Sequence, residues 1–250
     1  MTAPAGEPTA LAPSVDVRPA TGATTAVALV LAGGKASSYA PSETGHLAVA
    51  RMRPFAALLH RRGRRRGLAV WLVRYRYRGW NGADRSPVAD TRWALDEVRR
   101  RHGDVPVALV GHSMGGRTAF AVGDDPSVRG ICALAPWVED GDPADQLAAA
   151  TVLIAHGNLD VVTSPRASRR YADRIIAAGG TAGYLVVTGD MHAMVFRWRR
   201  WNRITVGFTF GVLGLAPMPR WLDRLLQRGP TEVGRLAAGD QPGNDSGEHG

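Results

Sequence analysis

The feature that most constrains the fold of this chain is the alternation of short apolar runs with longer amphipathic segments. The apolar runs are rich in Val, Leu and Ile and do not alternate strictly with polar residues, as expected of strands buried on both faces. They span residues 26–32, 68–75, 105–111, 129–136, 150–157 and 182–189. Helical patterns lie between them. This order predicts an α/β fold, with a mostly parallel central sheet and helices on both faces.

The chain divides by composition into three parts. Residues 1–24 are rich in Pro, Ala and Thr and are expected to be loose, with one short strand near Val15–Val17. Residues 25–228 carry the strand–helix alternation and are long enough for one α/β domain. Residues 229–250 end in GDQPGNDSGEHG and are expected to be disordered.

The formal net charge of +9 comes almost entirely from arginine, because Lys35 is the only lysine. The densest run, residues 58–67, falls where a helix is predicted to end, and cations stabilise that end of a helix. No nucleic-acid-binding motif accompanies it, so we expect no nucleic-acid partner. The N-terminus does not resemble a signal peptide, and the longest apolar run, 204–218, is too short for a comfortable membrane span. A cytoplasmic protein is expected.

The Arg- and Trp-rich segment 196–226 fits two readings. It fits a final helix whose apolar side packs on the sheet, which we favour. It also fits a helix that touches a membrane surface, so peripheral membrane contact stays open as the lesser alternative.

The segment VALVGHSMGGRTAF, residues 107–120, predicts a strand, a tight turn at Ser113 and a helix. A turn that exposes a serine hydroxyl crowds the positions two before and two after it, which are Gly111 and Gly115 here. The pattern G-x-S-x-G is weak evidence alone in a chain with 30 glycines. The strand before it and the helix after it favour a nucleophilic serine.

A serine nucleophile needs a base and a carboxylate that orients the base. Asp160 follows the predicted strand 150–157, and His192 follows the strand 182–189 and precedes a helical pattern at residues 193–203. Because ligands of such sheets bind at the carboxyl ends of the strands, these two residues are the preferred acid and base. Asp190 is interpreted as a turn residue, and His112 and His156 are interpreted as structural residues. Other carboxylates, which lie in polar connections, are alternatives for the acid. Those alternatives are Asp124, Asp125, Asp140, Asp142 and Asp145.

The chain resembles the α/β-hydrolases over roughly residues 26–215. The matching segments are GHSMGG, HGNLDVVTSP and GDMH. The resemblance implies Ser113 as nucleophile, Asp160 as acid and His192 as base, in an esterase-like enzyme that forms an acyl-enzyme. It implies a small-molecule acyl substrate, with no cofactor and no metal. It also implies an oxyanion hole from the backbone N–H of Met114 and a second donor in LAGGKASS, either Gly34 or Lys35. Ala32 stands where many relatives have histidine.

The predicted pocket is open, because residues 137–150 leave room for one short helix rather than a lid. Trp80, Trp137 and Tyr39 are candidates for binding the substrate, although packing of loops explains the tryptophans equally well. An ester or thioester is the expected substrate. An acyltransferase or perhydrolase on the same triad, and a noncatalytic binding protein, remain alternatives. A phosphate loop at GGKASS fails the spacing of that motif, and the sequence does not determine the oligomeric state.

Overall fold

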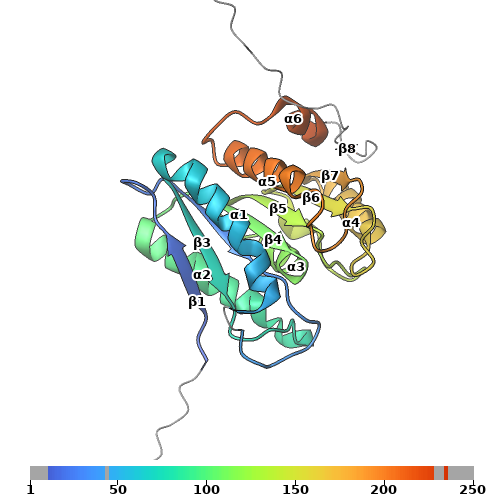
Figure 1. Ribbon diagram of the computed structural model, residues 1–250, viewed down its shortest axis with the longest axis horizontal. Helices are drawn as coiled ribbons and strands as arrows, with labels where there is room; N and C mark the ends of the chain where they lie inside the picture. Colours follow the sequence, from blue (N-terminus) through green and yellow to red (C-terminus); the bar gives the residue numbers. More distant parts are fainter. Residues whose placement is uncertain (1–10, 43–44, 228–233, 236–250) are drawn as a thin grey trace, which may run out of the picture.

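The computed structural model describes residues 11–42, 45–227 and 234–235, and its centre is one eight-stranded sheet in the order β1-β3-β2-β4-β5-β6-β7-β8 (Figure 1). Only β1 runs antiparallel to its neighbour; the other pairs are parallel. The strands are β1 (Ser14–Arg18), β2 (Ala26–Leu31), β3 (Leu68–Arg74), β4 (Val107–His112), β5 (Val128–Leu134), β6 (Thr151–Gly157), β7 (Thr181–Val187) and β8 (Gly234–Arg235). The predicted fold class is confirmed.

The helices lie on both faces of the sheet, as the sequence predicts (Figure 1). They are α1 (Leu47–Gly63), α2 (Ser86–His102), α3 (Met114–Ala121), α4 (Pro165–Ala177), α5 (Trp198–Val212) and α6 (Arg220–Gln227). Helices α1, α5 and α6 cover one face, and α2, α3 and α4 cover the other. In the described part of the chain, no helix is both long enough and apolar enough to span a bilayer.

Strand β2 shows why the predicted runs are apolar throughout. Its residues Ala26, Ala28 and Val30 face α1 and α5, whereas Val27, Leu29 and Leu31 face the opposite layer. All six are buried, because successive side chains of a central strand point into two different cores.

Two expectations need correction. Gly234 and Arg235, within the segment expected to be disordered, pair in parallel with Leu185 and Val186, because β7 otherwise leaves an edge with unpaired backbone groups. The rest of the predicted tail, 228–233 and 236–250, lies outside the described residues, as do residues 1–10 of the predicted loose N-terminus. The helical pattern placed directly after His192 begins only at Trp198.

Candidate active site

Ser113 lies in a sharp turn between β4 and α3, with φ 55° and ψ −120°. A non-glycine residue rarely adopts this backbone conformation, and such strain persists where the surroundings enforce it. A Cβ on Gly111 would lie 2.3 Å from the Gly115 carbonyl oxygen, and one on Gly115 would lie 2.3 Å from the Leu31 carbonyl oxygen. Glycine is therefore required on both sides of the turn, as the sequence predicts.

Asp160 and His192 are brought together at the carboxyl ends of β6 and β7. Nδ1 of His192 lies 2.8 Å from Oδ2 of Asp160. Because a carboxylate only accepts hydrogen bonds, the proton of the neutral ring sits on Nδ1, and Nε2 is left as the basic nitrogen. The structure therefore brings the two predicted side chains into hydrogen-bond contact, while their roles as acid and base stay a prediction.

Asp160 is held as a carboxylate by several donors. Oδ1 accepts hydrogen bonds from the backbone N–H groups of Val162 and Thr163, at 2.8 and 3.0 Å. Burial opposes the charged form, but the hydrogen bonds from His156, His192 and the two backbone groups outweigh it and hold the pKa of Asp160 well below its usual range.

Two further residues of this network were not recognised as partners of the acid. The fully buried His156 places Nε2 3.0 Å from Oδ2 of Asp160, while its Nδ1 lies 2.9 Å from the Ser168 hydroxyl. The Thr163 hydroxyl lies 3.0 Å from Oδ2 of Asp160 and 3.1 Å from Nδ1 of His192. A threonine three residues after an acid in a turn is a local signal for such a contact; His156 carries no comparable signal.

Ser113 is placed near His192 through its neighbour His112. The rings of His112 and His192 have centroids 4.7 Å apart, and Nε2 of His112 lies 3.0 Å from the backbone oxygen of His192. Burial, together with repulsion between the protonated forms of His112 and His192, lowers the pKa of His112 to about 3. His112 is therefore a neutral donor to the loop that carries His192. Within the described residues, the Ser113 hydroxyl forms no hydrogen bond with the His192 ring; such bonds are often long before substrate binds.

Asp190 organises the loop after β7 and is more than a turn residue. It is fully buried, and its Oδ2 accepts hydrogen bonds from the Arg197 backbone N–H and from Nε1 of Trp201, at 2.8 and 2.9 Å. Its Oδ1 accepts from the Met191 N–H. These bonds hold residues 191–197 as a loop, which explains why α5 starts later than predicted.

The two candidates for the second oxyanion donor differ in their backbone contacts. The Lys35 N–H donates to the Arg78 carbonyl oxygen at 2.8 Å, so it is already engaged. Among the described residues, the backbone N–H groups of Gly34 and Met114 have no backbone acceptor. A Cβ on Gly34 would lie 2.4 Å from Cε of Met114, which places the two segments in direct contact. The engaged N–H of Lys35 therefore favours Gly34 as the candidate for the second donor.

Trp80 and Trp137 enclose Arg117. The guanidinium carbon of Arg117 lies 4.4 Å from the centre of the Trp80 ring and 4.3 Å from that of Trp137. Arg117 is buried and also pairs with Glu139 and Asp142, at 2.7 and 2.6 Å. The rings thus contribute to packing, and they also border an open groove of about 430 Å³.

The remaining candidates lie away from the acid–base pair. Tyr39 is exposed, and its hydroxyl donates to Asp84 at 2.5 Å. Four of the five alternative acids pair elsewhere: Asp124 with Arg92, Asp125 with Arg99, Asp140 with Arg170 and Asp142 with Arg117. The fifth, Asp145, begins a short 3₁₀ turn. Residues 137–150 contain only the short 3₁₀ turn Asp145–Leu147, in agreement with the absence of room for a lid.

The strand order, the turn at Ser113 and the acid and histidine after β6 and β7 define an α/β-hydrolase fold. Residues 76–151, which include Ser113 but end before Asp160 and His192, match the family model Hydrolase_4, described as serine aminopeptidase, S33. No curated protein matches the chain.

Solved structures agree on the fold. An alpha-beta serine hydrolase homologue from Coxiella burnetii is 19% identical, with a TM-score of 0.57, over 78% of this chain and 90% of its own. Est1E from Butyrivibrio proteoclasticus, solved with ferulic acid, is 11% identical, with a TM-score of 0.60, over 81% and 96%. The esterase Est2 from Thermogutta terrifontis, solved with propionate, is 16% identical, with a TM-score of 0.59, over 83% and 92%.

Proposed function

We propose that the protein is a serine hydrolase that cleaves a carboxylic ester or thioester through an acyl-enzyme. The observation that carries the proposal is the 2.8 Å hydrogen bond between Asp160 and His192 on the loops next to the strained turn of Ser113. A carboxylate, an imidazole and a serine at a strand–helix turn together supply what nucleophilic attack by a hydroxyl requires.

In the first half of the reaction, the Ser113 hydroxyl oxygen attacks the carbonyl carbon of the substrate, and its proton moves to Nε2 of His192. Asp160 holds the ring through Nδ1–H and stabilises the imidazolium. The tetrahedral intermediate collapses when His192 gives the proton to the departing alcohol or thiol, and the acyl group stays on Ser113. Water then gives a proton to His192 and attacks the acyl carbon, which releases the acid and restores Ser113.

The oxyanion of both intermediates would be bound by the backbone N–H groups of Met114 and Gly34. Their lack of a backbone acceptor among the described residues supports this role. The N-terminus of α3 adds its dipole at the same place. One such donor is worth on the order of 10²–10³ in rate.

The short connection between residues 137 and 150 favours small acyl groups, since it holds only the 3₁₀ turn Asp145–Leu147 and has no room for a lid. Est2, an esterase solved with propionate, and Est1E, solved with ferulic acid, have a similar fold, which supports an ester as the substrate. The roles of Trp80, Trp137 and Tyr39 in substrate binding remain predictions.

The test is hydrolysis of p-nitrophenyl esters of increasing acyl length by the wild type, Ser113→Ala and His192→Ala. Ser14→Ala is the matched control, since Ser14 lies in β1 at the other edge of the sheet. We expect turnover of the short esters to fall at least about 10³-fold in both site variants and to stay unchanged in the control. Equal turnover by folded Ser113→Ala and wild type contradicts the proposal. No turnover of any ester by the wild type favours a noncatalytic protein.

A further inference from the structure

The two loops that carry Asp160 and His192 expose an unusual set of apolar side chains. Val161 is 95% exposed, Phe196 65% and Trp198 55%. An isolated exposed apolar side chain is ordinary, but a cluster of them marks an interaction surface. The full set is Leu159, Val161, Val162, Met191, Val195, Phe196 and Trp198.

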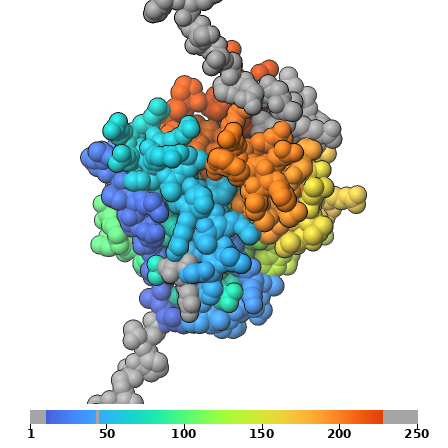
Figure 2. All heavy atoms as spheres, viewed as in Figure 1, coloured from blue at the N-terminus to red at the C-terminus, as the bar shows by residue number. Residues whose placement is uncertain are grey.

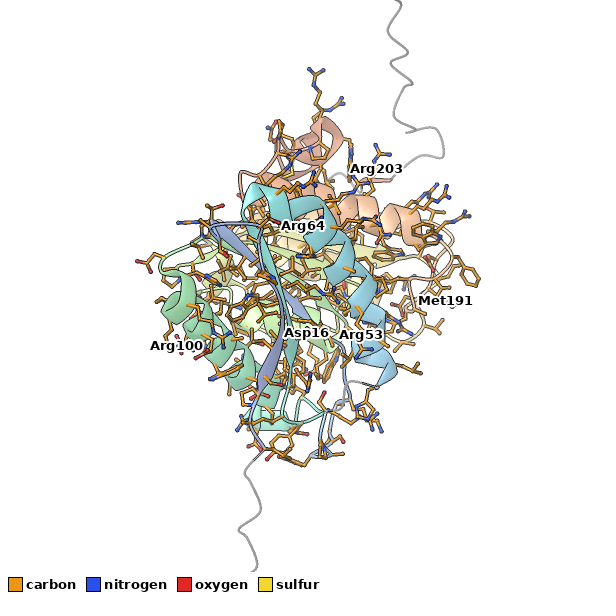
Figure 3. All side chains as sticks on the ribbon, turned by 60° about the vertical axis from the view of Figure 1, so that its left-hand side comes forward. Asp16, Arg53, Arg64, Arg100, Met191 and Arg203 are labelled. Carbon is orange, nitrogen blue, oxygen red and sulfur yellow. The ribbon has the colours of Figure 1, made fainter. Side chains whose placement is uncertain are left out.

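These apolar side chains come from two loops that contact each other. The Leu159 N–H donates to the Asp190 carbonyl oxygen at 3.0 Å, and the Gly189 N–H donates to the Asn158 side chain at 2.7 Å, so the two loops are bound to each other. Trp198 begins α5 and continues the surface onto that helix. In Figure 3, Met191 and Arg203 lie on the opposite side of the molecule from Arg100 of α2.

The surroundings of this surface are strongly basic. Segments 158–170 and 188–203 contain seven arginines, whereas their only acidic residues, Asp160 and Asp190, are buried. The seven are Arg166, Arg169, Arg170, Arg197, Arg199, Arg200 and Arg203. Exposed carboxylates within these segments therefore do not balance their positive charge, although Arg170 pairs with Asp140 of another segment.

Arginines of α1 extend the basic surface. Figure 2 shows the atoms of α1 beside those of α5 on one face of the molecule. A groove of about 530 Å³ lies between the two helices, with Arg61 and Arg62 on one wall and Trp198 and Arg199 on the other. In the part of the chain that the structure describes, Arg61, Arg62 and Arg199 form no salt bridge.

We propose that this surface docks the protein on an anionic phospholipid bilayer. We call it the docking surface: the seven exposed apolar residues, with Arg61, Arg62 and the arginines of segment 188–203. Arginines beside anionic headgroups each contribute about 1 kcal/mol of attraction, and the apolar and aromatic side chains insert at the boundary between headgroups and acyl chains. Nucleic acid would satisfy the arginines but would leave Val161, Val162 and Val195 in water.

Docking turns the edge of the molecule that carries Asp160 and His192 toward the bilayer. The apolar residues of segment 196–226 divide into two groups in the structure. Trp201, Ile204 and Phe208 pack in the core, whereas Phe196 and Trp198 are exposed. The helix thus packs on the sheet along one side, and its N-terminal end contributes to the docking surface.

The test is co-sedimentation of the full-length protein with vesicles, with every protein carrying Ser113→Ala, so that the result does not depend on ester hydrolysis. Vesicles of phosphatidylcholine with about one third phosphatidylglycerol are compared with pure phosphatidylcholine. One variant removes the aromatics (Phe196→Ser with Trp198→Ser), and another removes the charge (Arg61→Gln, Arg62→Gln and Arg199→Gln). The control is Leu11→Ser with Arg100→Gln, which changes an exposed apolar residue just before β1 and an arginine of α2.

We expect the protein to bind anionic vesicles at least about tenfold more strongly than pure phosphatidylcholine vesicles. Each of the two docking-surface variants is expected to bind anionic vesicles at least about tenfold more weakly, and the control is expected to bind them unchanged. Raising the salt concentration to about 0.5 M is expected to weaken binding to anionic vesicles, because salt screens the attraction between the arginines and the headgroups. Absence of vesicle binding, or binding that both variants retain, overturns the proposal. Tighter binding of duplex DNA than of anionic vesicles also overturns the proposal. Self-association of the protein that is lost in the aromatic variant overturns it as well.

Discussion

The strained turn at Ser113 leads to a prediction about stability. At φ 55° and ψ −120°, a residue with a Cβ is strained by roughly 1–3 kcal/mol, whereas glycine is not. Ser113→Ala keeps the Cβ and its strain, and Ser113→Gly removes both. Glycine also makes the unfolded chain more flexible, which lowers stability by roughly 0.5–1 kcal/mol. The net expectation is that Ser113→Gly is more stable than Ser113→Ala by about 1 kcal/mol.

The assay is urea or thermal unfolding of the two variants, both of which lack the hydroxyl. A difference of about 1 kcal/mol corresponds to about 2–4 °C in Tm for a domain of this size. The matched pair is Ser14→Ala and Ser14→Gly in β1, where no positive φ is found and glycine is expected to be the less stable variant. If Ser113→Gly is also less stable than Ser113→Ala by the same amount, the backbone at Ser113 is not strained and the argument for an enforced turn is refuted.

Three further predictions test the surroundings of the site. Gly115→Ala places a Cβ 2.3 Å from the Leu31 backbone oxygen and is expected to lower the free energy of unfolding by about 2 kcal/mol. Gly141→Ala places a Cβ in open space and is expected to change it little. Equal effects of the two substitutions in urea unfolding would show that glycine is not required at position 115. His156→Leu removes a buried donor to Asp160 and is expected to lower the free energy of unfolding by about 1–3 kcal/mol, and His156→Gln is expected to regain part of that stability. An unfolding curve of His156→Leu identical to that of the wild type argues against the contact. Because the pKa of Asp160 is lowered by folding, its contribution to stability is complete above about pH 4 and is lost as the pH falls, at about 1.4 kcal/mol per pH unit. Asp160→Asn is expected to lack that part of the acid dependence in unfolding measured between pH 5 and 2, and an unchanged slope contradicts it.

The positions of the strands along the chain were predictable, because a strand buried on both faces is an apolar run that can be recognised without knowing its neighbours in the sheet. The same reasoning placed Asp160 and His192 at strand ends, and the structure brings them within 2.8 Å. Glycine at 111 and 115 followed from the geometry of the turn. These features are local, so the sequence around each one contains the whole signal.

Contacts between distant segments were not predictable in the same way. His156 reads as part of an apolar strand, and its contact with Asp160 depends on the path of the loop that follows. Arg117 reads as the start of a helix, yet its burial depends on rings contributed by Trp80 and Trp137. Asp190 reads as a turn, but its three hydrogen bonds reach forward to residues as far as Trp201 and delay the start of α5. A single sequence gives no record of such pairings.

The most direct test of the proposed chemistry is labelling with a fluorophosphonate probe, followed by intact mass and peptide mapping. The account predicts one adduct on the folded wild type, located at Ser113, loss of the adduct in Ser113→Ala, and slow labelling in His192→Ala. Ser14→Ala is expected to label as the wild type does. Folded wild type that takes up no probe, or an adduct that persists in Ser113→Ala, would contradict the assignment of Ser113 as the nucleophile.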